Sequence, residues 1–268
     1  MPRQDLEYPK EAHNTVKRYN HLASYTLRTI HTIINTTPLL HISFNTTPSS
    51  PFPSTIPMIG QMGSFSHPSS SLSDVLDLYI HGYISARLTN LTRSSPGLPV
   101  TISASTVDGL LLSLTPFSHG YNYRSAVLFG HATVVTDPAE KLYAMELITN
   151  KVVPNRWSES RSPPTPGEMA ATAVMKVKID TGSAKVRTGP PKDDKVDLDS
   201  DEVRERVWVG TVPVYTVIGE PVAAEYNLVK EVPNTLAEWR KEANQDAKEY
   251  AELAAVKDLA PKKKKEDD

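Results

Sequence analysis

The stretch Ser118-His-Gly-Tyr-Asn-Tyr-Arg-Ser-Ala-Val-Leu-Phe-Gly130 places a polar, aromatic and cationic cluster directly before an apolar run that ends on glycine. The apolar run predicts a buried β-strand, and Tyr123, Arg124 and Ser125 would form its first residues. Rigid backbone would hold the Arg124 guanidinium in place, and a fixed guanidinium suits a phosphate or carboxylate because it can donate two parallel hydrogen bonds. Two interpretations of Arg124 are open: a ligand contact, or a structural pair with an acidic side chain at the rim of a barrel.

A second stretch, Asp77-Leu-Tyr-Ile-His-Gly-Tyr-Ile-Ser-Ala-Arg-Leu88, predicts a short strand that stops at His81-Gly82. Gly82 permits a tight turn and the close approach of a ligand to the backbone. Ser85 and Arg87 then supply a hydroxyl and a positive charge near the expected start of a helix, a position that favours phosphate. The stretch lacks the glycine spacing of a Walker or Rossmann loop.

These segments, taken in chain order with two others, resemble the flavin-binding split-barrel superfamily of pyridoxamine 5'-phosphate oxidase. Within it, they are similar to the nitroimidazole-resistance-type flavoproteins. The resemblance covers roughly residues 10 to 230 and rests on Thr55-Ile-Pro-Met58, Leu78-Tyr-Ile-His-Gly82 with Ser85 and Arg87, Asn122-Tyr-Arg-Ser-Ala-Val-Leu-Phe-Gly130, and Trp208-Val-Gly-Thr-Val-Pro213. Its most specific part is the Asn-Tyr-Arg-Ser run followed by an apolar strand and Phe-Gly.

The resemblance implies a mainly β fold with flanking helices, a split β-barrel, and flavin mononucleotide (FMN) as cofactor. It also implies a homodimer with two equivalent cofactor sites at its interface and a small-molecule substrate. The cofactor-binding residues that it implies are Thr55, Ile56, Pro57, Met58, His81, Gly82, Ser85, Arg87, Tyr123, Arg124, Ser125 and Trp208.

Each implied site residue has an expected role. The strand matching Thr55 to Met58 lays its backbone along the flavin ring in the family. Arg87 and Ser85 are the candidates for the phosphate, while Arg124 and Ser125 would complete that shell or reach the edge of the ring. His81 would lie near the ribityl chain or the ring, and it is the one candidate for a catalytic residue; the alternative is a surface histidine satisfied by backbone. Trp208 would stack near the flavin across the dimer interface, or else belong to the core.

Two departures from the family pattern bear on function. Thr55 and Ala86 stand where the oxidase proper has a basic residue and a second cation, so the phosphate shell has fewer charges. The C-terminal arginine-rich substrate motif of the vitamin B6 oxidase has no match, which argues against pyridoxamine phosphate as substrate. Three functions remain open: an FMN-dependent oxidoreductase or reductase of unknown substrate, a haem-binding or haem-degrading split barrel, and a non-catalytic flavin-binding or scaffold protein.

The composition of the chain excludes several further classes of protein. A formal net charge of -2 gives no basic excess for nucleic acid. The absence of cysteine removes disulfides, thiolate metal sites and cysteine nucleophiles. The eight histidines show no His-x-x-x-His spacing with a neighbouring acid, so we expect no metal site.

The N-terminus has no apolar signal stretch, and no apolar run approaches the 20 or so residues of a membrane span. We therefore expect a cytoplasmic protein without membrane contact, with the run Lys262 to Lys265 as a candidate nuclear signal.

Periodicity and turn residues predict the order of the elements. We expect a helix over 13–36, and strands over 39–44, 54–59, 100–107, 109–116, 124–135, 173–179 and 208–217. Asp108-Gly109 predicts a hairpin turn, Asp137 caps a helix that runs through Ile148, and further helices are expected over 85–91 and 235–257. Residues 60–73 are expected to form a surface insertion or lid, and 187–205 an exposed loop. The predicted organisation is a barrel domain over 1–230, followed over 231–268 by a charged helix and a lysine-rich disordered tail.

Overall fold

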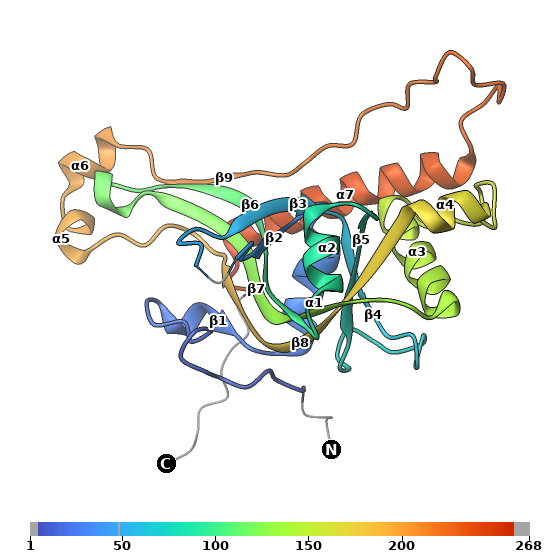
Figure 1. Ribbon diagram of the computed structural model, residues 1–268. Helices are drawn as coiled ribbons and strands as arrows, with labels where there is room; N and C mark the ends of the chain where they lie inside the picture. Colours follow the sequence, from blue (N-terminus) through green and yellow to red (C-terminus); the bar gives the residue numbers. More distant parts are fainter. Residues whose placement is uncertain (1–4, 48, 260–268) are drawn as a thin grey trace. The chain divides into compact units, whose positions relative to one another are not determined.

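A computed structural model of the chain describes residues 5–47 and 49–259 (Figure 1). The lysine run 262–265 and the rest of the tail lie outside the described residues. The chain divides into two compact units: the first comprises residues 1–105 and 125–185, and the second comprises 106–124 and 186–268. The predicted division at residue 230 stays a prediction.

The described residues form a mainly antiparallel, unclosed β-sheet with helices. The strands follow the order β3-β2-β6-β7-β8-β5-β4, with β1 paired to β8 and β9 paired to β6. Their bounds are β1 Ala23–Ser24, β2 Leu40–Phe44, β3 Ser54–Met58, β4 Gly60–Gly63, β5 Asp77–Tyr83, β6 Leu98–Leu112, β7 Gly120–Val134, β8 Thr172–Arg187 and β9 Gly210–Pro213. The helices are α1 Leu27–Thr36, α2 Arg87–Arg93, α3 Pro138–Val152, α4 Pro166–Ala171, α5 Lys195–Leu198, α6 Asp201–Arg206 and α7 Asn234–Val256, with short 3-10 turns at Asn20–Leu22 and Pro116–Ser118. No helix among the described residues is long and apolar enough to cross a bilayer.

In the first unit, helices pack against strands that bury one face. In β2, Leu40, Ile42 and Phe44 are buried while the intervening residues are not, as a strand with one covered face requires. In Figure 1, α1 packs on β4, and α3 packs on β4 and β5. One cluster of buried residues joins α3 to the sheet through Tyr79, Val135, Ala144, Ile148 and Val174.

Gly130 explains the conspicuous Phe-Gly pair. A Cβ atom at this position would lie 2.2 Å from the carbonyl oxygen of Lys178 in β8, which is far inside contact distance. Only glycine lets β7 approach β8 this closely. The strand continues beyond it to Val134.

Several predicted elements are confirmed with small shifts of their ends, namely the strands at 39–44, 54–59 and 124–135 and the helices at 85–91 and 235–257. The strand predicted at 173–179 is also present, but β8 continues to Arg187. The N-cap of α3 is also confirmed, because Asp137 Oδ1 accepts hydrogen bonds from the backbone N–H groups of Ala139 (2.7 Å) and Glu140 (3.4 Å).

The helix predicted over 13–36 is wrong in its first half, since α1 begins only at Leu27. Asn14 is buried and donates to backbone of the same segment and of β8, while Ala23 and Ser24 pair with Lys185 and Ala184. Ala23, one of the apolar residues that suggested a helix, therefore belongs to a strand. Within the predicted insertion 60–73, residues 60–63 form β4 against β5, because Gly60 to Gly63 find partners from Ile80 to Asp77.

The predicted Asp108-Gly109 hairpin is also wrong, because β6 runs unbroken from Leu98 to Leu112. Asp108 is buried and pairs with Arg124, so it serves as an ion-pair partner within a strand instead of a turn residue. The chain turns instead over 113–119. The loop predicted over 187–205 contains α5 and the start of α6, and the strand predicted over 208–217 is limited to Gly210–Pro213.

Candidate functional site

The strand β3 stands at one end of the sheet order, so its outer backbone edge is available. Its residues pair with β2 in the register Leu40 to Met58 through Phe44 to Ser54, and the described residues provide no strand on its other side. Thr55 and Pro57 are exposed, whereas Ile56 and Met58 are half-buried. An edge of this kind can offer main-chain groups to a flat ligand.

The end of β5 extends past its neighbour β4. The last residue of β5 paired with β4 is Ile80, opposite Gly60, while pairing with β8 continues to Tyr83. His81 is exposed, and no hydrogen bond of its side chain occurs among the described residues. Desolvation by neighbouring atoms lowers the pKa of His81, so the neutral imidazole is favoured near pH 7.

Gly82 brings three elements of the first unit together. A Cβ atom at Gly82 would lie 3.7 Å from Met58 Cε of β3 and 3.7 Å from Thr89 Oγ1 of α2. The predicted site residues Met58 and Gly82, which are separated by 24 positions, are therefore neighbours. The start of α2 lies beside them, since Thr89 Oγ1 donates to the Tyr83 carbonyl at 3.2 Å.

Ser85 and Arg87 lie at the start of α2 with uncommitted side chains. The turn before α2 is held by backbone and by Asn90, whose Nδ2 donates to the Ser85 carbonyl at 3.1 Å. Arg87 is exposed, and the described residues offer it no hydrogen bond or ion pair; the same holds for the Ser85 hydroxyl. Arg93 of the same helix differs, because it donates to the carbonyl of Ile84 at 3.4 Å.

Arg124 belongs to the second unit and is already paired. Its Nε and Nη2 donate to Asp108 Oδ2 and Oδ1 at 2.9 and 2.7 Å, and its guanidinium carbon lies 3.9 Å from the centre of the Tyr250 ring. Burial alone would lower the pKa of Arg124, but the hydrogen bond to Asp108 and its charge outweigh burial and raise it. Of the two interpretations that the sequence left open, the geometry favours the structural pair.

The remaining predicted residues are distributed between the two units. Ser125 belongs to the first unit, where its hydroxyl donates to the Lys185 carbonyl at 3.3 Å. Tyr123 is half-buried in the second unit. Trp208, also in the second unit, is 66% exposed and precedes β9, with its ring folded over Gly210. It is therefore outside the core, and its contact with a flavin stays a prediction, as does the convergence of all these residues on one cofactor.

The sequence did not reveal a cavity of about 960 Å³ within the first unit. Its polar residues include Glu11, His13, His131 and Asp180, which come from three distant parts of the chain. No spacing rule connects residues so far apart, and the wrong helix prediction over 13–36 placed His13 on the wrong element. In the sequence, His13 and His131 are isolated histidines with no pattern that connects them to each other.

Comparison with known proteins defines the class of fold. The flavocytochrome Anf3 from Azotobacter vinelandii is 27% identical, with 86% of this chain and 97% of that chain covered and a TM-score of 0.70. The FAD and haem binding protein from Mycobacterium smegmatis is 25% identical, with 81% and 97% covered and a TM-score of 0.65. A 5-nitroimidazole antibiotic resistance protein from Bacteroides thetaiotaomicron is 18% identical, with 61% and 86% covered and a TM-score of 0.46. The fold is that of the flavin-binding split barrels.

Residues 26–186 match the family model of pyridoxamine 5'-phosphate oxidase. The chain belongs to this family, and the resemblance carried by its motifs is confirmed. Among curated proteins no sequence match is found.

Proposed function

We propose that the protein binds a flavin in the first unit, against β3, His81-Gly82 and the start of α2, and that it acts as an oxidoreductase. The observation that carries this proposal is the pair Ser85 and Arg87 at the start of α2, whose side chains have no partner among the described residues. Thr89 of the same helix lies beside Gly82, as does Met58 of β3. Two structures of the same fold, covered over 97% of their chains, are of a flavocytochrome and of an FAD and haem binding protein.

The residues at this site fit the chemical groups of a flavin. An exposed guanidinium without an internal partner can bind a phosphate through charge-assisted hydrogen bonds, and the Ser85 hydroxyl can donate beside it. The free edge of β3 offers backbone donors and acceptors to a planar ring, and Gly82 leaves space at the end of β5. A bound flavin would supply the electron transfer, while the protein would supply binding, orientation and a neutral imidazole at His81.

A more specific part of the proposal is that the flavin is FMN and not FAD. FMN carries a single phosphate, and Arg87 is the cation that the site provides for it. FAD is the alternative, because it is the flavin named for the Mycobacterium smegmatis structure. FAD carries a second phosphate and an adenosine, which would need contacts beyond Arg87 and Ser85. Chromatography of the cofactor released from heat-treated protein distinguishes the two forms.

Haem is a second candidate because both of these related structures are described as containing it, one as a flavocytochrome and the other as an FAD and haem binding protein. A haem iron needs an axial ligand such as a neutral imidazole. His81 and His41 are exposed and have no hydrogen-bond partner among the described residues, so either could serve. The remaining alternative is a barrel that binds ligand without catalysis, which the reduced number of cations near Thr55 and Ala86 leaves open.

The absorption spectrum of the purified protein, before and after addition of FMN, FAD or haemin, tests these functions. We expect flavin bands in the blue region, and oxidation of NADH or another reductant that depends on the flavin. A Soret band without flavin bands would support the haem protein instead. A protein that takes up none of these cofactors would contradict both proposals and support the scaffold.

The homodimer also stays a proposal, and the second unit offers a surface for it. Residues 214–233 connect β9 to α7 without regular structure, and they expose apolar side chains including Val222 (94% exposed), Tyr226 (88%) and Leu228 (94%). An extended segment that exposes large apolar groups is typical of an arm that packs on another chain. A second copy covering this arm would remove these side chains from water.

A further inference from the structure

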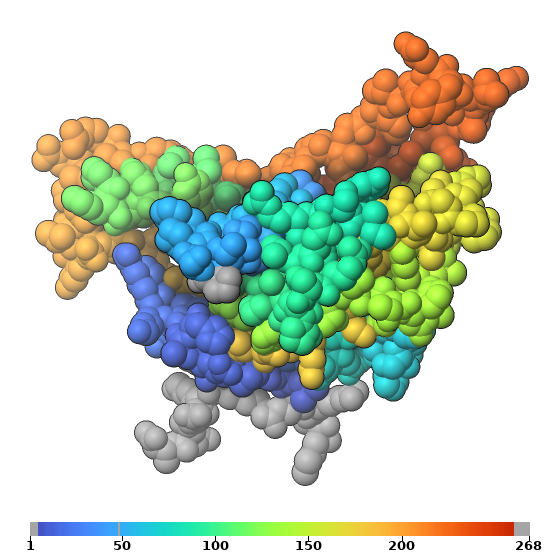
Figure 2. All heavy atoms as spheres, in the orientation of Figure 1, coloured from blue at the N-terminus to red at the C-terminus, as the bar shows by residue number. Residues whose placement is uncertain are grey.

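A preformed cavity of about 960 Å³ opens in the first unit, and none of the residues assigned to the flavin belongs to its lining. Its lining comes from the end of β2, the start of β6, the segment 50–53, β7, β8 and the N-terminal segment. In Figure 2 the N-terminal segment in dark blue and the segment around residue 50 in light blue lie near one another on the same face. A cavity of this volume is large enough for a small organic ligand.

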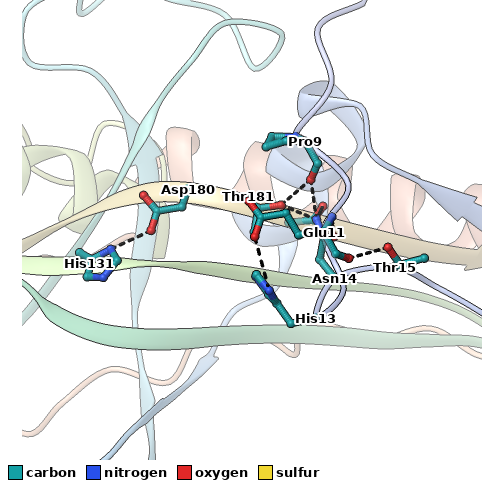
Figure 3. Close-up of polar contacts among 9 residues, drawn as sticks. Pro9, Glu11, His13, Asn14, Thr15, His131, Asp180 and Thr181 are labelled. Carbon is teal, nitrogen blue, oxygen red and sulfur yellow. Dashed lines mark hydrogen bonds and ion pairs between the residues drawn. The ribbon is translucent and has the colours of Figure 1, made fainter.

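The N-terminal wall of the cavity is held firmly by Asn14 (Figure 3). Asn14 Nδ2 donates to the carbonyls of Pro9 (2.8 Å) and Gly182 (3.0 Å) and to Thr181 Oγ1, while its Oδ1 accepts from the Glu11 backbone at 2.7 Å. Thr181 Oγ1 in turn donates to the Pro9 carbonyl at 2.6 Å. Asn14 and Thr181 are both buried, so this network fixes Glu11 and His13 over β8.

Two imidazole–carboxylate pairs lie at the cavity. His131 Nδ1 lies 2.7 Å from Asp180 Oδ2, and His13 Nδ1 lies 3.6 Å from Glu11 Oε2. The described residues that line the cavity include these two carboxylates and no lysine or arginine. Even with both imidazoles protonated, the lining would carry no net positive charge. The site therefore disfavours an anion and favours a ligand with a positive charge.

Apolar and aromatic groups form the other part of the lining. The ring of Phe129 meets the ring of His13 edge to face, with centroids 4.6 Å apart at 81°, and Phe44 and Val100 contribute buried apolar surface. Three prolines, at 51, 53 and 99, add rigid apolar surface. Such a lining stabilises a flat apolar body, and its carboxylates stabilise a cation.

We propose that this cavity is a second ligand site, which takes a small aromatic compound carrying a protonated amine. The ring of the ligand packs against Phe129 and His13, and its ammonium group binds Asp180 and Glu11. None of the flavin residues of the same unit lines this cavity, although the lining residue Ser43 shares a hydrogen bond of 2.8 Å with the Thr55 hydroxyl of β3.

Isothermal titration of the full-length protein with tryptamine, and with indole-3-acetate as the anionic counterpart, tests the proposal. We expect tryptamine to bind and indole-3-acetate to bind at least tenfold more weakly. The substitutions Asp180→Asn and Phe129→Ala should each weaken tryptamine binding by about tenfold or more. Glu146→Gln, which removes an exposed carboxylate of α3 outside the cavity, should leave it unchanged.

Three outcomes would overturn the site: no binding of tryptamine, equal affinity for the two indoles, or an affinity that Asp180→Asn and Phe129→Ala leave intact. Thermal melting of each variant verifies that the fold survives, and a second variant, Glu11→Gln, examines the other carboxylate independently. Arg87→Ala should not change tryptamine binding. This control separates the cavity from the flavin site, so the failure of one proposal does not imply the failure of the other.

Discussion

At the scale of single residues, Arg87 and Arg124 show how the environment decides what a cation can do. Arg87 is exposed and has no partner among the described residues, so its full hydrogen-bonding capacity is available to a ligand. Arg124 donates to both oxygens of the buried Asp108 and lies over the Tyr250 ring. A guanidinium in this position contributes mainly to the fold.

Replacing Arg124 should therefore damage stability more than cofactor binding. Arg124→Met leaves the buried carboxylate of Asp108 unpaired, and we expect the free energy of unfolding to fall by about 3 kcal/mol. The double variant Asp108→Leu with Arg124→Met should recover most of this loss, because no isolated charge remains. Urea unfolding measures the free energy of unfolding of the single and the double variant. If Arg124→Met retains wild-type stability but loses flavin, the interpretation of Arg124 as a structural residue is wrong.

His31 should make stability depend on pH. It is fully buried, accepts a hydrogen bond at Nε2 from the Tyr8 hydroxyl (2.7 Å) and donates from Nδ1 to the Leu72 carbonyl (2.9 Å). Burial lowers the pKa of His31 to about 4. Between this value and 6.5 the unfolded chain binds a proton that the folded chain does not, so stability falls as the pH falls through this window, by up to about 3 kcal/mol.

Urea unfolding from pH 4 to pH 7 checks this prediction, with His31→Gln as the comparison. The variant cannot titrate at this position, so the difference in stability between wild type and variant should shrink toward pH 4. A constant difference across the range would contradict the assignment of His31 as a buried neutral imidazole.

At the scale of elements, Asn122 ties α7 to the segment after β8 within the second unit. Its Nδ2 donates to the carbonyls of Gly189 and Ala254, each at 3.0 Å. Asn122→Ala removes both donors, and we expect a loss of about 1–2 kcal/mol and faster hydrogen exchange in the last turns of α7. Exchange in α1, which belongs to the first unit, serves as the internal control. Unchanged protection of α7 would refute this role.

The elements also show what the sequence could predict and what it could not. The strands around Asn122 to Gly130 and the cap at Asp137 were readable because local chemistry decides them. The Asp108-Gly109 turn failed because Arg124, 16 residues away, recruits Asp108 into a strand. The helix over 13–36 failed because Asn14 binds β8, 167 residues further along the chain. Long-range pairing overrode local preference at these two places.

In the candidate site, too, some features could be predicted from the sequence and others could not. The order of Met58, Gly82, Ser85 and Arg87 in the sequence predicted a flavin site. The structure brings Met58 and Gly82 together, and the binding of a flavin by these residues stays a prediction. The cavity beside His131 had no sequence pattern, because β7, β8 and the N-terminal segment each contribute only two or three residues. A site assembled from three distant segments becomes visible only in the fold.

At the scale of the whole molecule, the exposed arm 214–233 predicts self-association. Val222→Glu together with Leu228→Glu places charges on side chains that the single chain leaves exposed, so the fold should survive while the dimer dissociates. Light scattering after size exclusion should show the mass of two chains for the wild type and of one for the variant. Val196→Glu, at an exposed valine of α5, is the control and should remain dimeric. A wild type with the mass of one chain would exclude the dimer.

The most direct test of the flavin site is the dissociation constant of FMN for Arg87→Ala, measured by fluorescence quenching of the flavin. A lost charge-assisted contact to phosphate should weaken binding by about ten- to a hundredfold, and Arg87→Lys should restore part of the affinity. Arg28→Ala removes another exposed arginine, from α1, and this variant should bind FMN as the wild type does. If Arg87→Ala binds FMN as tightly as Arg28→Ala, the start of α2 does not hold the phosphate, and the proposed site is wrong.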